Sequence, residues 1–186
     1  SPSKSYYANI NSSEFYNISA ARYYLKDGVF YRNYSRTDVH TNNGDPKDIY
    51  GFLNWGAAVF PAEHYAIFVS AHGSGIISWT GFSAAGPKRS IAYDDHPYNY
   101  LSATEYKNAF SSIKNKIGKK IDIITFDSCV MGMLEVAYQL KDCAEYFVAS
   151  EAVALERDTA LFSRKFMALA DKSALAVSKA IVDSYI

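Results

Sequence analysis

The chain has 186 residues, of which 49% are hydrophobic and 20% charged, so it suits a folded domain and not a disordered tail. Its 19 basic residues balance its 19 acidic ones, which excludes an overall basic field for nucleic acid, and no apolar run approaches the roughly 20 residues of a membrane span. Aromatic residues make up 16% of the chain, and a large core is the usual reason for such a content. We expect one monomeric domain over residues 1–186.

The first forty residues are polar and Tyr-rich, and they predict hairpins or irregular structure. The run TNNGDP at 41–46 then predicts a turn and a helix start, with Asp45 as N-cap and Pro46 in the first helical position. The apolar face of this helix extends to about Ala58. A continuous apolar run at 65–71 predicts a strand buried on both faces, which ends at the run HGSG.

A long loop extends from there to about Asp95, and Ser102 and Glu105 begin a helix with the spacing of a capping box. Gly118 ends this helix, and a second buried strand follows at 121–126.

The run DSC at 127–129 follows this second strand, and a helix is predicted from Met131 to about Leu140. A third strand is expected at 145–150, and two further helices near 160–170 and 173–185. Strands that alternate with helices predict an α/β fold, in which a parallel sheet is covered by helices on both faces.

Ligands bind at the carboxyl ends of strands in such sheets, and His72 and Cys129 both follow strand ends. A thiol beside a histidine is what a nucleophile with a general base requires. A helix that begins just after Cys129 would favour the thiolate, and the N–H groups of Gly73 and Cys129 are candidate oxyanion donors. A lone cysteine at a strand end is more often a small buried hydrophobe, so spacing alone leaves both hypotheses open. Cys143, at a helix end without such neighbours, is predicted to be structural.

Acidic residues are concentrated between Asp122 and Asp158, a stretch that contains eight acidic residues and two basic ones. We expect the cysteine side of the cleft to be acidic and to prefer a cationic substrate group. Glu135 and Asp142 are expected to face solvent on helices instead.

Two runs, AHGSG at 71–75 and FDSCVMGMLEVAY at 126–138, resemble the clostripain family of cysteine peptidases. The resemblance extends over about 41–151, through the upstream runs NGDP, FLNWG and FPAEHY and the downstream run AEYFVASE. It implies a caspase-like three-layer sandwich with a mostly parallel central sheet. It also implies an endopeptidase that cleaves after Arg or Lys through an acyl-enzyme.

By the same resemblance, His72 is the general base, Cys129 is the nucleophile, and Gly73 and Cys129 donate to the oxyanion. Asp127 matches a position of the acidic primary specificity pocket.

The second carboxylate of the pocket would be Asp158, with Glu156 as the alternative, although residues 153–157 depart from the family's glycine-rich pattern. Trp79 matches a tryptophan that often follows the histidine motif and is a further substrate-binding candidate.

The loop SAAGPKRS at 83–90 is small and turn-rich, as preferred nicking sites are. It contains Lys88 and Arg89, the residue types that the pocket should accept, and family members are often matured by cleavage in this interval. The sequence therefore predicts self-cleavage after Lys88 or Arg89.

The resemblance implies protein or peptide substrates with exposed Arg or Lys and a secreted or cell-surface bacterial enzyme. The chain begins Ser1-Pro2 without a signal-peptide pattern, so we expect that an export signal was removed or that this is a fragment of a longer protein. No cofactor is required by the predicted chemistry. Some relatives use calcium, for which Asp94 and Asp95 could supply oxygen ligands.

Three alternatives remain open. The first is an inactive member of the same fold that acts as a binding module, which separation of His72 from Cys129 would favour. The second is a carbohydrate- or ligand-binding domain built on a coplanar platform of exposed Tyr and Trp rings in the N-terminal part. The third is a cation site at residues 94–96, where the run DDH is more often a solvated turn.

Overall fold

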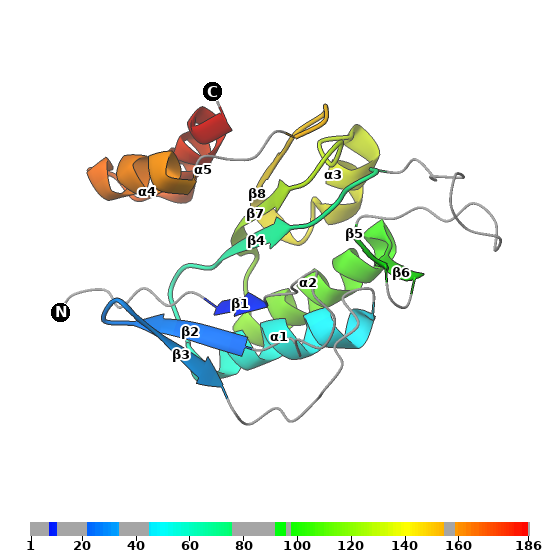
Figure 1. Ribbon diagram of the computed structural model, residues 1–186, viewed down its shortest axis with the longest axis horizontal. Coiled ribbons are helices and arrows are strands. Elements are labelled where there is room, and N and C mark those ends of the chain that lie inside the picture. Colours follow the sequence, from blue (N-terminus) through cyan, green and yellow to red (C-terminus); the bar gives the residue numbers. More distant parts are fainter. Residues whose placement is uncertain are drawn as a thin grey trace.

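The computed structural model describes residues 8–10, 22–33, 45–75, 92–95, 98–154 and 159–185 (Figure 1). The strands in this part of the chain are β1 (Ala8–Ile10), β2 (Arg22–Lys26), β3 (Val29–Asn33), β4 (Ala66–Ser70), β5 (Ala92–Asp95), β6 (Tyr98–Leu101), β7 (Ile121–Asp127) and β8 (Ala144–Ala149). The helices are α1 (Pro46–Val59), α2 (Ala103–Ile117), α3 (Leu134–Leu140), α4 (Thr159–Ala168) and α5 (Ala174–Val182), and the 3₁₀ turn η1 (Asp183–Tyr185) follows α5.

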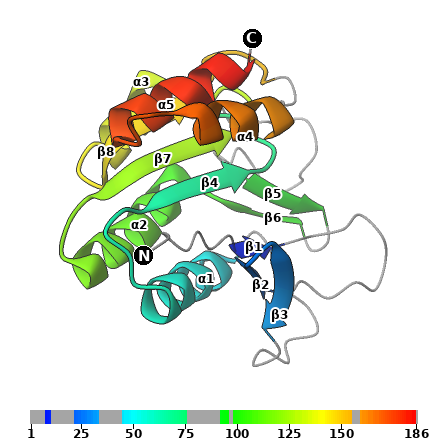
Figure 2. The same ribbon diagram turned by 90° about the vertical axis from the view of Figure 1, so that its left-hand side faces the viewer.

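The central sheet has the strand order β4-β7-β8, and both pairs of strands are parallel. Figure 2 shows α4 and α5 on one side of this sheet and α1 and α2 on the other. The observed layers confirm the predicted α/β sandwich, because parallel strands joined by helical crossovers are covered on both faces.

Two apolar clusters fix the layers. The larger one packs side chains of α1, α2 and α3 against β7, where the ring of Phe126 meets those of Tyr106, Phe110 and Phe147 at 5.3 to 6.4 Å between centroids. The smaller cluster joins Ile123 of β7 to α5 on the opposite face. The neighbours Ile123 and Ile124 thus point to opposite layers, which holds the strand in the middle of the sandwich.

The capping residues are the ones that the sequence predicts. The Asp45 carboxylate accepts a hydrogen bond from the backbone N–H of Lys47 at 2.9 Å, and Pro46 is the first residue of α1. Ser102 and Glu105 form a reciprocal capping box at the start of α2. Gly118 ends α2 in the left-handed conformation, with φ of 73°. These local signals set the helix ends because each satisfies backbone groups that the helix leaves unpaired.

The prediction that the strand at 65–71 is buried on both faces is wrong. Ala66, Phe68 and Ser70 are exposed on one face of β4, although Phe68 meets Phe162 of α4 at 5.6 Å between ring centroids. The reason is that α5 packs over β7 and β8 and leaves this face of β4 less covered.

The predicted loop up to Asp95 also contains structure, because β5 and β6 pair as an antiparallel hairpin. In the Tyr-rich part, β1, β2 and β3 form a separate antiparallel sheet. The β2–β3 turn uses Asp27 and Gly28, both with positive φ (52° and 79°), as a two-residue hairpin turn requires. The hairpin rests on α1, where the guanidinium of Arg22 lies 5.6 Å from the centre of the Trp55 ring.

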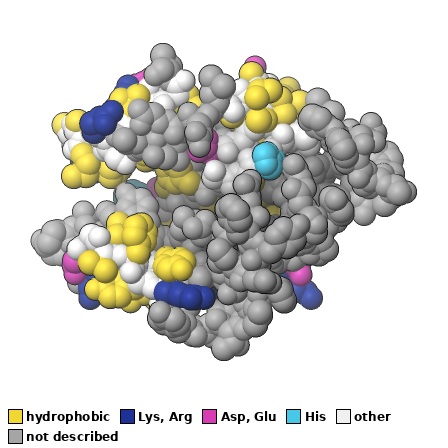
Figure 3. Space-filling view, in the orientation of Figure 1, with side chains coloured by type: hydrophobic (Ala, Val, Ile, Leu, Met, Phe, Trp, Pro, Cys, Tyr) yellow, Lys and Arg dark blue, Asp and Glu magenta, His cyan; other side chains and the backbone are white. Residues whose placement is uncertain are grey.

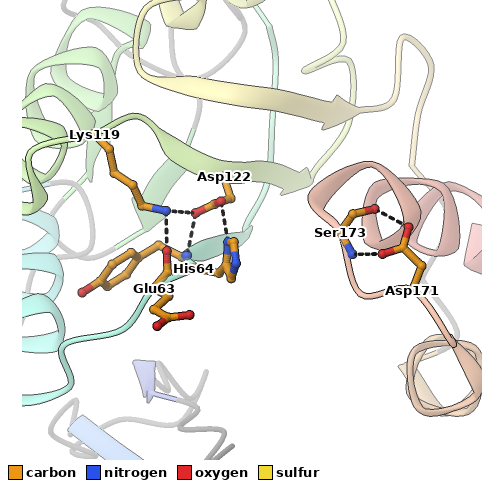
Figure 4. Close-up of polar contacts among 7 residues, drawn as sticks. Glu63, His64, Lys119, Asp122, Asp171 and Ser173 are labelled. Carbon is orange, nitrogen blue, oxygen red and sulfur yellow. Dashed lines mark hydrogen bonds and ion pairs between the residues drawn. The ribbon is translucent and has the colours of Figure 1, made fainter.

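A polar cluster ties β4 to β7 at the amino ends of these strands (Figure 4). Asp122 accepts hydrogen bonds from the backbone N–H of Tyr65 at 2.9 Å and from Lys119 at 3.0 Å, and His64 Nδ1 lies 2.8 Å from its other oxygen. Lys119 also donates to the carbonyl of Glu63. Burial raises the pKa of Asp122, but the contacts with His64, Tyr65 and Lys119 outweigh it and hold the pKa below its usual range.

We expect Asp122→Asn to lower the free energy of unfolding by about 1–2 kcal/mol at pH 7, because the Tyr65 N–H, His64 and Lys119 lose an ionised acceptor that is itself mostly covered. A carboxyl with a lowered folded-state pKa stabilises the fold above its unfolded pKa of about 4 and ceases to do so as the pH falls through the folded value. The deficit of the variant should therefore narrow below about pH 4 in denaturant titrations. Glu145→Gln, which changes an exposed acid on β8, is the control, and an equal deficit of Asp122→Asn at pH 7 and pH 3 would contradict the expectation.

Candidate active site

The register of β4 and β7 brings the two predicted catalytic residues to one edge of the sheet. Ser70 pairs with Asp127 in the parallel ladder. His72 follows Ser70 by two residues and Cys129 follows Asp127 by two, so the two segments leave the sheet at the same edge. His72 is exposed and Cys129 is half-buried, which suits side chains at the mouth of a site.

Gly73 packs directly against the loop that carries Cys129. A Cβ atom at Gly73 would collide with the backbone carbonyl oxygen of Cys129, and it would lie 2.9 Å from Met131 Cγ and 3.0 Å from Ser128 Cβ. These three neighbours are the predicted nucleophile itself, the residue before it and the second residue after it. Glycine is therefore needed here for the close approach of two backbones, and the predicted oxyanion donors Gly73 and Cys129 belong to segments in contact.

The two cysteines lie in different surroundings. Cys129 is half-buried, and its Sγ lies 4.0 Å from the carbonyl oxygen of Ala154, in the segment after β8. Cys143 is 1% exposed within the larger core cluster, near Ser111 Oγ at 3.5 Å and the carbonyl of Lys107 at 3.8 Å. Both thiols are free, and the burial of Cys143 agrees with its predicted structural role.

The helix that was expected just after Cys129 begins later, at Leu134. The intervening turn contains Val130 with φ of 50°, and it is held to the segment after β8 by two backbone hydrogen bonds, Val130 N–H to Ala152 at 2.9 Å and Gly132 N–H to Ser150 at 2.7 Å. The prediction that a helix dipole favours the Cys129 thiolate is wrong, because four residues separate the thiol from a helix of seven residues.

Asp127 has a partner that the sequence did not suggest. The hydroxyl of Tyr185 in η1 donates a hydrogen bond of 2.7 Å to Asp127 Oδ1. The two residues are 58 positions apart, so no local spacing could have paired them. A long-range contact of this kind depends on the packing of the α4–α5 layer onto the sheet.

The acids between 122 and 158 do not all lie at the edge of the sheet that carries His72. Asp122 lies at the amino end of β7, about 17 Å from Asp127 at 3.4 Å per residue, and its charge is engaged by His64 and Lys119. Asp127 lies at the other end of β7, at the carboxyl edge of the sheet, where His72 follows β4.

Several predicted site residues lie outside the described residues, namely Trp79, Lys88, Arg89, His96, Glu156 and Asp158. Asp94 and Asp95 belong to β5, but their side chains are not among those described. Within the part that the structure describes, no group of three or more acidic, histidine or cysteine side chains could hold a metal ion. The same part contains no helix that is long and apolar enough to cross a membrane.

Two of the described Tyr rings of the N-terminal sheet stack face to face and do not lie side by side in one plane. The rings of Tyr24 and Tyr31 stack on each other at 5.2 Å with planes 15° apart, so each covers a face of the other. Hydrophobic side chains nevertheless gather over the β2–β3 hairpin and over α4 and α5 (Figure 3), and Val29 and Phe30 are 52% and 63% exposed.

Comparison with known proteins identifies the family. The model of the clostripain family matches residues 14–186. Clostripain of Hathewaya histolytica is 27% identical over 117 residues, which are 61% of this chain and 21% of that protein. A secreted C11 cysteine protease of Bacteroides thetaiotaomicron, solved with an irreversible peptide inhibitor, has a TM-score of 0.66 at 19% identity over 90% of this chain and 44% of its own.

An inactive zymogen C11 protease of Parabacteroides distasonis has a TM-score of 0.64 at 16% identity, over 90% of this chain and 43% of its own. The chain thus spans about a fifth of the curated relative and less than half of either solved structure. The shared architecture is the caspase-like sandwich that the sequence predicted. The match of the family model over 14–186 shows that the chain belongs to the clostripain family.

Proposed function

We propose that the chain contains the catalytic centre of a cysteine endopeptidase that cleaves peptide bonds after Arg or Lys. The observation that carries the proposal is the contact between Gly73 and the backbone of Cys129, because it makes neighbours of the two loops that bear His72 and Cys129. The proposal takes residues 1–186 as one peptidase domain, acting as a monomer on proteins with exposed basic side chains.

In the proposed reaction, the Cys129 thiolate attacks the carbonyl carbon of the scissile bond after His72 has accepted the thiol proton. The N–H groups of Gly73 and Cys129 donate to the oxyanion of the tetrahedral intermediate. His72 then gives its proton to the leaving amine, and the acyl-enzyme forms. Water, deprotonated by His72, attacks the thioester and releases the acid product with the free thiol.

Specificity is assigned to the Asp127 carboxylate, which would receive the cationic end of the substrate side chain. The position of Asp127 at the last pair of the β4–β7 ladder, two residues before the nucleophile, supports this role. Asp158 or Glu156 would supply a second carboxylate, and Trp79 would contact the substrate.

Asp127→Asn should lower the preference for Arg and Lys reporters over Ala and Leu reporters by about tenfold or more, since removing one desolvated charge partner costs at least 1.4 kcal/mol. The measurement is kcat/KM for reporter peptides that differ only in the residue before the scissile bond. Glu135→Gln, an exposed acid on α3, should leave the preference as in the wild type. Full discrimination by Asp127→Asn would move the pocket elsewhere, and a wild-type preference for Asp would overturn the proposed specificity.

The proposal includes self-processing after Lys88 or Arg89, in a secreted protein. The descriptions of two relatives, one secreted and the other an inactive zymogen, support these two points. Mass spectrometry should find two associated fragments in the wild type, with a new N-terminus at Arg89 or Ser90, and an intact chain in Cys129→Ala. An intact wild type that hydrolyses reporters would show that this cut is not needed for activity.

A further inference from the structure

We propose that Tyr185 is a positioning residue for substrate recognition, which it exerts through Asp127. The inference rests on the proposed function of Asp127 and adds to it the element that orients the carboxylate. It gives the C-terminal turn η1, which lies beyond α4 and α5 in the chain, a part in substrate specificity.

The hydroxyl of Tyr185 is held at a defined place. Its ring packs, partly buried, against the cluster of Ile123, Val177 and Ile181 between the sheet and α5. The neighbouring Ser184 is 2% exposed, and its hydroxyl donates to the carbonyl of Ile181 at 2.6 Å. The turn is thus held by the ring of Tyr185 and by the side chain of Ser184 just before it.

Asp127 presents its side chain toward the same layer. Side chains alternate along β7, so Asp127 points to the same face as Ile123, which packs against α5. The 2.7 Å distance from the Tyr185 hydroxyl to Asp127 Oδ1 is that of a well-formed O–H···O hydrogen bond. Asp127 is half-buried, and an aspartate that is anchored by one oxygen loses rotational freedom without losing its charge.

The pairing has a consequence for binding energy. A cationic substrate side chain that meets a pre-oriented carboxylate does not have to order it on binding. Removal of the hydroxyl should therefore weaken binding of the charged substrate and leave the bond-making step at Cys129 nearly unchanged.

The experiment compares Tyr185→Phe with the wild type on two reporters that end in Arg or in citrulline, which has a similar shape without the charge. We expect KM for the Arg reporter to rise by about tenfold with kcat nearly unchanged, and the Arg-to-citrulline ratio of kcat/KM to fall by a similar factor. Tyr146→Phe is the matched control, because Tyr146 also packs, partly buried, against the Ile123 cluster. The Arg-to-citrulline ratio of kcat/KM for this variant should equal that of the wild type.

A double-mutant cycle separates the inference from the function on which it rests. If Tyr185 acts through Asp127, then the Asp127→Asn variant and the variant with both changes should share one Arg-to-citrulline ratio. A ratio that Tyr185→Phe leaves unchanged while Asp127→Asn lowers it would overturn the role of Tyr185 and leave the proposed function standing. An equal loss on both reporters would mean that Tyr185 serves only the fold. A wild type that cleaves neither reporter would overturn the proposed function and the role of Tyr185 with it.

Discussion

Replacement of Cys129 by Ala should lower kcat/KM for Arg and Lys reporters by at least about a thousandfold, to the background rate, because the proposed acyl-enzyme cannot form without the thiol. The half-buried position of Cys129 at the carboxyl edge of the sheet makes its thiol the one that a substrate can approach. His72→Ala should cause a loss of similar size, since a nucleophile and its base act as a unit. The measurement is the initial rate of reporter hydrolysis at matched concentrations of folded protein.

Cys143→Ala is the control. Its thiol is 1% exposed in the core, so the change should cost stability of about 1 kcal/mol through a small cavity and leave kcat/KM within about twofold of the wild type. Equal losses of activity in Cys129→Ala and Cys143→Ala would disprove the assignment of the nucleophile. Full activity of His72→Ala would disprove the dyad.

The second large effect is expected at Gly132, in the turn after Cys129. A Cβ at this position would lie 2.8 Å from the carbonyl carbon of Ser150, 2.9 Å from the oxygen of Ala149 and 2.9 Å from the nitrogen of Glu151. All three atoms are backbone, so the turn has to move away from β8. We expect Gly132→Ala to lower the free energy of unfolding by about 2–3 kcal/mol and kcat/KM by about a hundredfold, as a misplacement near 1 Å does.

Gly56→Ala is the matched control for this change. Gly56 lies within α1, and no atom would lie within 4 Å of its added Cβ. Because Gly costs a helix interior about 0.5–1 kcal/mol relative to Ala, this variant should be more stable than the wild type and fully active. Thermal unfolding and reporter kinetics on both variants check the pair. Wild-type kinetics in Gly132→Ala would show that the turn after Cys129 tolerates displacement.

The parts of the fold that followed from the sequence are those that local chemistry decides. Asp45, Pro46 and the capping box of Ser102 and Glu105 set helix ends, because each satisfies backbone groups within a few residues. The apolar run at 121–126 predicted β7, because a strand covered on both faces has apolar side chains on both and does not alternate with polar ones. The place of His72 and Cys129 at one edge followed from the same strands.

The Tyr-rich first forty residues predicted hairpins or irregular structure without a position for either. Asp27-Gly28 between two runs of strand-forming residues is a strong hairpin signal that fixes the position, and β2 and β3 pair across it. The predicted strand at 121–126 already put Asp122 at its amino end, away from Asp127. Two acids five residues apart in a strand lie at opposite ends of it, so their closeness in sequence does not place them in one site.

Other features depend on packing that no local pattern encodes. The late start of α3 follows from the contact of Gly132 with the segment after β8, which involves residues about twenty positions away. The bond between Tyr185 and Asp127 spans 58 positions and depends on how α5 lies on the sheet. Such contacts are decided by tertiary structure, which overrides the intrinsic preference of a short segment.

The left-handed backbone of Val130 sets a limit on how far this protein could be stabilised by engineering. A β-branched residue with φ of 50° costs about 1–3 kcal/mol, which a glycine at the same place would recover. The strained peptide adjoins Cys129, however, and its N–H is bound to Ala152 across the site. A more relaxed turn would give the thiol more positions to occupy, so under the proposed function a stabilising change at Val130 should lower turnover.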